Sequence, residues 1–335
     1  MGKRWGNMGK LTRVISILLA GNFVLLAGCT DQPIKETKAS EQQPKTKVEK
    51  KVEKKKEEEK PVFVSIIDPK TKATIKTFNP KELGFSTDLE KYKAEISKIA
   101  RELARGTETT PGYDKRMILD KLDVKGQVIK GTPQTILDED ELIEKVTQLS
   151  VKGGNVEVPL YVTASGYKVE DAAHLGEVLV ASYTTHFNSG VVGRSKNIAL
   201  SAQAINNVIL GVGDSFSFNT TVGPSDAAHG FQKAPEAVEG KLVDGIGGGI
   251  CQTSSTLFNA IDKLGVSYIE KHHHSLQVGY VPTGRDATVS YGGKDFRFKN
   301  TTGAPVILKA IVRKGSLTVE VRTAKAYQDI IKKQM

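Results

Sequence analysis

The residues best suited to chemistry are a cysteine behind a run of glycines and a group of histidines farther along the chain. Cys251 follows Gly249 and Ile250, and histidines occupy positions 272 to 274. A thiol acts as a nucleophile at neutral pH when its pKa is lowered and a base lies near it. A helix N-terminus with an adjacent imidazole supplies both conditions. The pattern predicts a cysteine enzyme.

Cys251 has two competing interpretations. Most free cysteines are small buried hydrophobic residues. The consecutive glycines favour a site instead, because they permit unusual dihedral angles and the close approach of a substrate backbone. Zinc accepts sulfur and nitrogen ligands, yet apart from His272 and His274 the closely spaced ligand pairs of zinc sites are missing. We therefore expect a nucleophile, with no metal and no other cofactor.

A carboxylate after the histidines is a candidate orienting group. If the histidines lie on a strand, alternation places His272 and His274 on one face and His273 on the other, so at most two serve the same site. Asp286 begins the next predicted strand, where it either orients an imidazole or caps the preceding turn. Papain-like and NlpC-type cysteine hydrolases share this order of a helix cysteine, a strand histidine and a carboxylate, which is an analogy of arrangement only.

Substrate contacts are predicted from glycines, an amide and two arginines. A guanidinium binds a carboxylate through two parallel hydrogen bonds, so either arginine is suited to a substrate carboxylate. The predicted substrate-binding residues are Gly247, Gly248, Gly249, Gln252, Arg194 and Arg285.

The cysteine requires a helix to hold it, and the sequence predicts one. Leu257, Ile261 and Leu264 share one helical face, and Gly265 is a natural C-terminal stop. A second amphipathic helix is predicted at 198–209. Strands are predicted at 178–184, 266–270, 275–280, 287–291, 296–299, 305–312 and 317–321. For residues 171–322 we therefore expect an α+β fold in which the cysteine-bearing helix packs on a mainly antiparallel sheet.

A smaller α+β domain is predicted at 61–168, and residues 323–335 form a C-terminal tail. The segments 61–67 and 74–78 predict a β-hairpin around an Asp-Pro turn. Thr87 and Glu90 predict a capping box ahead of an amphipathic helix. A second helical pattern at 142–149 and a strand at 156–162 follow. The smaller domain carries no catalytic motif.

The N-terminus predicts export and lipid anchoring. Basic residues precede an apolar run at 14–27, shorter than the roughly 20 residues of a spanning helix, and Leu26-Ala27-Gly28-Cys29 matches the lipobox of bacterial lipoproteins. We expect a signal peptide at 1–28, a lipid on Cys29 and a charged lysine- and glutamate-rich tether through residue 60.

These features place the protein on the extracytoplasmic face of the cell membrane, with Cys251 as its one free thiol. A lone thiol in an oxidising compartment is buried, bound to a metal or used. The formal net charge is +10, part of which lies in the signal peptide. Because no nucleic-acid motif accompanies this charge, we expect no nucleic-acid partner.

The cysteine segment resembles the VanW domain family, named from vancomycin-resistance gene clusters. The likeness rests on Gly-Ile-Gly-Gly-Gly-Ile-Cys-Gln-Thr-Ser-Ser at 245–255, His-His-His-Ser-Leu at 272–276 and Tyr-Val-Pro-Thr-Gly-Arg-Asp at 280–286. The region before it is similar to those of lipid-anchored VanW proteins in Gram-positive bacteria. By this resemblance Cys251 is the nucleophile. His274, then His272, is the expected base, since both match family histidine positions.

The resemblance implies peptidoglycan chemistry, with an L,D-transpeptidase-type acyl transfer as the predicted activity. The thiolate would attack the carbonyl after an L-residue in a stem peptide, expel a D-amino acid and form a thioester. An amine acceptor then gives a cross-link, whereas water gives hydrolysis. The alternatives are a cysteine peptidase or amidase that hydrolyses stem peptides, and a non-catalytic wall-binding lipoprotein linked to glycopeptide resistance.

Overall fold

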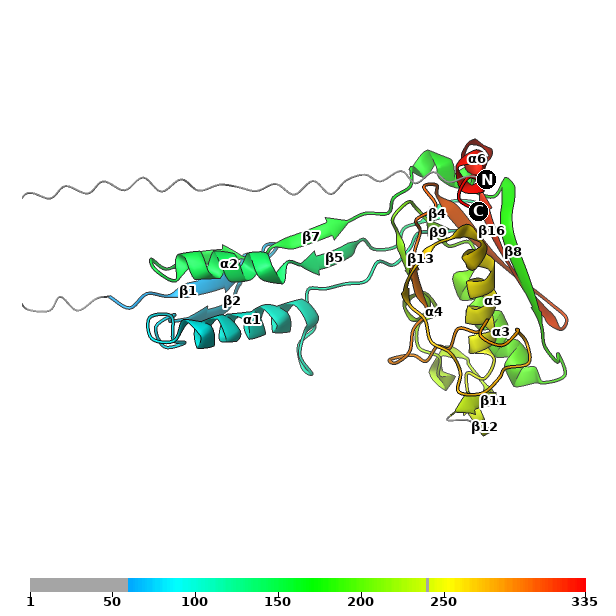
Figure 1. The fold of residues 1–335 in the computed structure, drawn as a ribbon, viewed down its shortest axis with the longest axis horizontal. Helices are drawn as coiled ribbons and strands as arrows, with labels where there is room; N and C mark the ends of the chain where they lie inside the picture. The colour runs from blue at the N-terminus through cyan, green and yellow to red at the C-terminus, as the bar shows by residue number, and fades with distance from the viewer. Residues whose placement is uncertain (1–59, 239–240) are drawn as a thin grey trace, which may run out of the picture. The chain divides into compact units, whose positions relative to one another are not determined.

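The computed structural model describes residues 60–238 and 241–335 (Figure 1). Helices mix with mainly antiparallel sheets, which confirms the expected α+β class. The predicted signal peptide, Cys29 and nearly all of the predicted tether lie outside the described residues. Across the two described ranges, none of the helices combines the length and the apolar character that crossing a bilayer requires.

The first part of the described chain has its own hydrophobic core. Strands β1 (Val64–Ile67) and β2 (Thr74–Phe78) form the predicted antiparallel hairpin, and β6 (Gly154–Glu157) pairs with β1 in parallel. Helices α1 (Leu89–Arg105) and α2 (Glu139–Leu149) pack against one another, and their apolar side chains join those of the sheet in one buried cluster.

Two local predictions for this part were wrong. The cap of α1 is Asp88 rather than Thr87, because the Asp88 carboxylate accepts a hydrogen bond from the Lys91 N–H at 3.0 Å. The strand predicted at 156–162 is two strands, β6 and β7 (Leu160–Thr163), which pair with different partners. Strand β7 pairs with β5 (Gln134–Leu137), and the short strands β3 (Lys121–Leu122) and β4 (Val128–Ile129) pair with one another.

The segment between α1 and β3 packs against the part of the chain that contains Cys251. Met117 and Leu119 are buried in the same hydrophobic cluster as the apolar residues of the cysteine helix. Arg116 forms an ion pair with the buried Asp295, with 2.9 Å between Nη1 and Oδ2. The domain boundaries at 61–168 and 171–322 stay a prediction, but Met117 and Leu119 of the upstream region share the second core.

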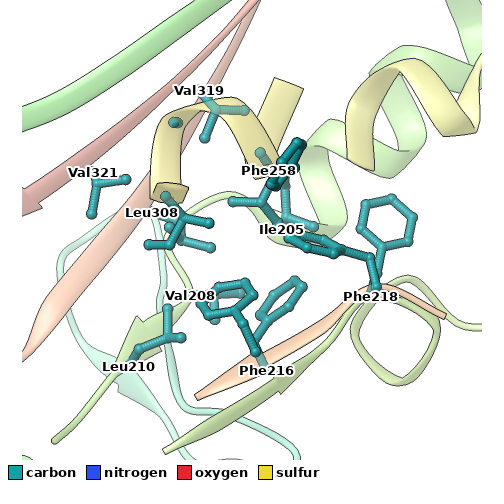
Figure 2. Close-up of a cluster of buried hydrophobic side chains, with 14 of the residues drawn as sticks. Ile205, Val208, Leu210, Phe216, Phe218, Phe258, Leu308, Val319 and Val321 are labelled. Atoms are coloured by element: carbon teal, nitrogen blue, oxygen red, sulfur yellow. The ribbon is translucent and has the colours of Figure 1, made fainter. Parts of the chain in front are cut away.

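A four-stranded antiparallel sheet supports the cysteine helix. Its strand order is β8 (Val178–His186), β16 (Ser316–Thr323), β15 (Val306–Arg313) and β9 (Ile209–Leu210). Helix α5 (Ile250–Ile261) contacts β8 and β16, and α3 (Val192–Ile205) contacts β15 and α5. Figure 2 shows the buried side chains of this core, with Phe258 of α5 near Ile205 of α3.

The strands predicted on either side of Asp286 were wrong. A second antiparallel sheet is formed by β10 (Ser215–Ser217), β14 (Arg297–Lys299) and β13 (Ser267–Glu270). Between β13 and β14, residues 271–296 form no strand. The apolar residues that predicted strands at 275–280 and 287–291 are therefore carried on turns and irregular backbone. The segment 271–290 is called the histidine loop below.

A hairpin between α3 and α5 was not predicted. Strands β11 (Lys233–Val238) and β12 (Lys241–Ile246) pair in antiparallel register from Lys233 opposite Ile246 onward. The remaining elements are α4 (Phe218–Val222), α6 (Gln328–Lys332) and the 3₁₀ helices Val169–His174, Ala227–His229, Asp262–Leu264 and Lys325–Tyr327. Helix α6 lies in the segment predicted as a tail.

Candidate active site around Cys251

Cys251 is the second residue of α5, and the glycines before it shape the entry to the helix. Gly247 and Gly249 have φ angles of +103° and +112°, which other residues rarely adopt. A side chain on Gly248 would place its Cβ 2.4 Å from the Ala234 carbonyl oxygen. The three glycines are therefore required by the chain's own packing, and their contact with substrate stays a prediction.

The first turn of α5 already uses part of its hydrogen-bonding capacity. The Ile250 N–H donates to the Gly247 carbonyl and the Gln252 N–H donates to the Gly249 carbonyl, both at 3.0 Å. Gly249, the residue that caps the helix, supplies no side-chain hydrogen bond. These two N–H groups are therefore engaged and do not serve as ready donors to an oxyanion.

The Cys251 thiol is partly buried and donates a hydrogen bond from Sγ to the Val289 carbonyl at 3.4 Å. Burial, the largest effect, raises the pKa of this thiol. The Val289 hydrogen bond and Arg194 lower the pKa, and the negative charges of Glu236 and Asp286 raise it. The expected lowering of the pKa by the helix N-terminus was therefore wrong. The resting group at neutral pH is a thiol, and it needs a base.

His274 is the one histidine among the described residues that line the cavity with Cys251. Its side chain is 5% exposed, and it lines, together with Cys251, a cavity of ≈ 600 Å³. The ring Nδ1 lies 2.7 Å from Oδ2 of Asp286, and the His274 backbone N–H donates to the same oxygen at 2.7 Å. When Nδ1 donates to Asp286, Nε2 is left as the acceptor that a general base requires.

The grouping that alternation predicted, with His272 and His274 together and His273 apart, is not observed. His273 shares the carboxylate with its neighbour, with 2.8 Å between its Nδ1 and Oδ1 of Asp286. His272 is bonded through Nε2 to Glu270 at 2.9 Å and does not line the cavity. The alternation argument fails because residues 271–274 are not a strand. His272 is therefore the less favoured of the two predicted bases, since it is not among the residues that line the cavity.

Asp286 is held ionised by its histidine neighbours. Burial raises the pKa of this carboxyl, but the hydrogen bonds from the His274 backbone and from the rings of His273 and His274 outweigh burial and lower the pKa to about 2. At neutral pH the carboxylate therefore accepts hydrogen bonds from both rings. Of its two predicted roles, this geometry supports the orienting one.

Buried polar side chains on α5 hold the histidine loop. The Ser254 hydroxyl donates to the Ala287 carbonyl at 2.5 Å, and the Ser255 hydroxyl accepts from the Ala287 N–H at 2.9 Å. The Asn259 amide donates to the Arg285 carbonyl at 2.7 Å. These bonds fix the backbone on both sides of Asp286 although no strand does so.

Arg194 lines the same cavity and is held in place from two directions. Its Nη2 donates to Oε1 of Gln252 at 2.8 Å, and its Nη1 donates to the Pro235 carbonyl at 3.4 Å. These bonds use two of the five guanidinium N–H groups. The guanidinium carbon also lies 5.7 Å from the centre of the Tyr280 ring. Arg194 therefore lines the cavity with guanidinium N–H groups that these two hydrogen bonds do not use.

The side-chain amide of Gln252 holds Arg194, and both its oxygen and its nitrogen are hydrogen-bonded within the protein. Its Nε2 donates to the Thr185 hydroxyl and to the His186 carbonyl, both at 3.0 Å, while its Oε1 accepts from Arg194. Its side chain is fully buried. We therefore interpret Gln252 as a positioning residue rather than a direct substrate ligand.

Arg285 does not reach the cavity. Its Nε donates to the Asn259 side chain and its Nη1 to Asp262, both at 2.7 Å, and its guanidinium carbon lies 4.6 Å from the centre of the Phe258 ring. Because these groups occupy the guanidinium, the predicted grip on a substrate carboxylate finds no geometric support. Arg285 fastens the histidine loop to the end of α5.

Sequence reasoning missed several cavity residues. Glu236 of β11, Tyr280 and Lys294 line the cavity with Cys251. Tyr280 lay in a matched family segment, which was the one available signal for it. Thr288 also lines the cavity, and its hydroxyl oxygen is the single buried side-chain nitrogen or oxygen without a hydrogen-bond partner in the described part of the chain.

A metal centre finds no support in this arrangement. Within residues 60–238 and 241–335, no three histidine, cysteine, aspartate or glutamate side chains are grouped so as to hold a metal ion. The zinc interpretation of the cysteine and histidines therefore has no ligand set among the described residues.

Comparisons with known proteins place the cavity residues in a recognised sequence region. A family model described as VanW like protein matches residues 193–322. The chain is 36% identical over 248 residues to the uncharacterized protein YoaR of Bacillus subtilis (strain 168), covering 73% of this chain and 78% of that protein. It is 30% identical over 111 residues to the vancomycin B-type resistance protein VanW of Enterococcus faecalis (strain ATCC 700802 / V583), covering 32% of this chain and 40% of that protein. No solved structure gives a significant match.

Proposed function

Because the chain belongs to the VanW-like protein family, we propose that it is a cell-wall protein whose Cys251 forms a thioester with peptidoglycan stem peptides. The observation that carries this proposal is that Cys251, His274 and Arg194 line one cavity, with the His274 ring bonded to the ionised Asp286. A nucleophile, a base, an orienting carboxylate and a cation are the parts that acyl transfer from a peptide requires.

In this mechanism His274 takes the thiol proton as sulfur attacks the peptide carbonyl. The C–S bond forms, the C–N bond to the leaving D-amino acid breaks, and the proton passes from His274 to the leaving amine. Because burial raises the pKa of Cys251, deprotonation accompanies attack rather than preceding it. Asp286 stabilises the imidazolium that exists between the two proton transfers.

Arg194 suits the terminal carboxylate of the leaving D-amino acid. A guanidinium with unused N–H groups binds a carboxylate more strongly in a partly enclosed cavity than in water. Desolvation by burial, the largest effect, lowers the pKa of Arg194. An arginine whose charged form is desolvated in this way gains from an anionic ligand. Transfer of the acyl group to an amine gives the L,D-transpeptidase-type reaction.

The cell-surface setting of this reaction is also part of the proposal. One relative is named as a vancomycin B-type resistance protein, which favours a place in cell-wall metabolism. The lipobox at Cys29 supports anchoring to the outer face of the membrane. Peptidoglycan stem peptides are then the substrate, and the membrane is a partner through the lipid.

The proposal is tested with the full-length protein in detergent and disaccharide-tetrapeptides. Intact-protein mass spectrometry should detect an acyl adduct, and muropeptide analysis should detect dimers. Cys251→Ala should remove both, a loss on the order of 10⁴-fold or more in rate. His272→Ala, which alters a histidine outside the cavity, is the matched control and should keep both.

Each outcome discriminates between the candidate functions. Shortened stems without dimers would identify a hydrolase that forms the same thioester. Absence of an adduct, of dimers and of shortened stems with the unmodified protein would overturn the enzymatic proposal. Retention of full biological function by Cys251→Ala would support a non-catalytic wall-binding role instead.

A further inference from the structure

A second, smaller cavity shares part of its lining with the larger one. It has a volume of ≈ 180 Å³ and shares Glu236, Gly247, Cys251, Val289 and Ser290 with the larger cavity. Its own walls come from α4 and the chain after it, from β12 and from Tyr291. Two cavities that meet at one nucleophile can hold two different reactants of a transfer reaction.

The two cavities differ in charge. The larger one is lined by Arg194 and Lys294 as well as by Glu236. Among the described residues that line the smaller one, Glu236 is the single acidic or basic side chain. The larger cavity therefore favours an anion, and the smaller one favours a cation.

Glu236 is available to a ligand. No described residue forms a hydrogen bond or an ion pair with its carboxyl group, although its side chain is partly buried. Burial raises the pKa of Glu236, which is the direction expected of a carboxylate that lacks a cationic partner. Its charge acts on Cys251, since it contributes to the raised pKa of that thiol.

The position of this carboxylate depends on a glycine of the facing strand. Glu236 lies opposite Val243 in the hairpin, so Gly245 is its diagonal neighbour. A Cβ on Gly245 would lie 1.7 Å from Oε1 of Glu236. The absence of a side chain at Gly245 therefore allows the carboxylate to lie where it does.

We propose that the smaller cavity is the acceptor site and that Glu236 binds the primary ammonium group of the incoming acceptor. The inference rests on the proposed thioester chemistry. The acceptor is an amine of a neighbouring stem peptide. Its ammonium gives one proton to Glu236, its nitrogen attacks the thioester carbonyl, the C–N bond forms and the C–S bond breaks. Cys251 is released, and the second nitrogen proton returns it to the thiol through His274.

The test separates acylation from acyl transfer. Full-length protein in detergent is acylated with disaccharide-tetrapeptide, and a primary-amine stem peptide is then added. Mass spectrometry measures the rate of adduct formation and the ratio of cross-linked to hydrolysed product. Glu236 also lines the larger cavity and raises the pKa of Cys251, so the rate of adduct formation is measured separately and the partition is followed from the preformed adduct. Glu236→Gln should lower the product ratio about tenfold, the scale of one charge-assisted hydrogen bond.

Two further variants control for charge and for position. Asp244→Asn removes a carboxylate from the same hairpin outside both cavities, and it should leave the ratio unchanged. Gly245→Ala keeps the Glu236 charge but displaces the carboxylate, and it should lower the ratio severalfold. A neutral acceptor that carries a hydroxyl in place of the amine should give the same low transfer in all variants.

The outcomes distinguish this inference from the function on which it rests. If the unmodified protein forms no thioester, the proposed function fails and the acceptor site fails with it. If the thioester forms and Glu236→Gln keeps the product ratio of the unmodified protein, the acceptor site alone is overturned.

Discussion

The histidine loop and the β11–β12 hairpin both line the cavity at Cys251, but different groups supply the hydrogen bonds that hold them. The hairpin is regular, with continuous antiparallel pairing. The loop has no strand, and side chains such as Ser254 and Asn259 of α5 bind its backbone instead. The proposed acid–base residues therefore lie where buried polar side chains fix the backbone, whereas Glu236, the proposed amine-binding residue, lies on a regular pair of strands.

The largest expected effect is on the loop side. His274→Ala should lower the rate of acylation by about 10²- to 10⁴-fold, because a positioned general base contributes that much. His272→Ala, two residues away and bonded to Glu270, should change the rate by less than about twofold. Stopped-flow or quenched mass spectrometry of adduct formation measures both. Equal losses in the two variants would contradict the choice of base.

Asp286→Asn should remove a pH-dependent contribution to the free energy of unfolding. The folded pKa of Asp286 is about 2, below the ordinary 3.8, so its stabilising effect is present above pH 4 and is lost as pH falls from about 4 to 2. The free energy of unfolding should then fall by about 2 kcal/mol over this range in the unmodified protein. Denaturant titrations at several pH values measure it, and a variant with the same pH dependence would break the argument.

A substitution of Arg194, which is hydrogen-bonded to Pro235 of the hairpin and to Gln252 of α5, tests the proposed binding of a substrate carboxylate. Arg194→Lys keeps the charge but loses the planar contacts with Gln252 and Pro235. It should raise KM for a stem peptide with a free C-terminal carboxylate about tenfold, with a smaller change in kcat. For a C-terminally amidated peptide the variant and the unmodified protein should have similar KM values. An equal loss with both peptides would exclude carboxylate binding.

The smallest effect on chemistry is expected at Arg285. Arg285→Ala removes the hydrogen bonds that join the histidine loop to Asn259 of α5 and to Asp262 just after it. The free energy of unfolding should fall by about 1 kcal/mol, since the Arg285 side chain is partly exposed. Acylation should stay within about twofold of the unmodified protein. A large rise in KM would restore the substrate-binding role predicted from sequence.

Sequence patterns predicted the helices and the long strands well, because burial on one face leaves a clear periodicity. The α5 pattern is one example, although α5 itself ends at Ile261 and Gly265 caps the 3₁₀ helix Asp262–Leu264 that continues it. The same reasoning failed in the histidine loop, where Val281, Ala287 and Val289 are buried without belonging to a strand. Apolar residues report burial, and a loop pinned by α5 buries them as a strand would.

The candidate site was predictable in its residue types but not in its partners. Cys251, His274 and Arg194 were chosen from sequence, and the structure brings all three to one cavity. The engagement of Arg285 by Asn259 and Asp262 depends on tertiary contacts that no local pattern encodes. Glu236 was missed because its strand contains a proline and faces a glycine, both of which weaken a strand signal.

Met117 and Leu119 are buried in the hydrophobic core that supports α5, which bears on how much of the chain forms one folding unit. The region that matches the family model, 193–322, begins after strand β8 and after both of these side chains. A protein trimmed to that region would lose an edge of the four-stranded sheet and part of its hydrophobic interior. The portion that the family model matches is therefore smaller than the portion that shares one hydrophobic core, so a substitution of Met117 or Leu119 by a smaller residue should destabilise the fold that holds the site.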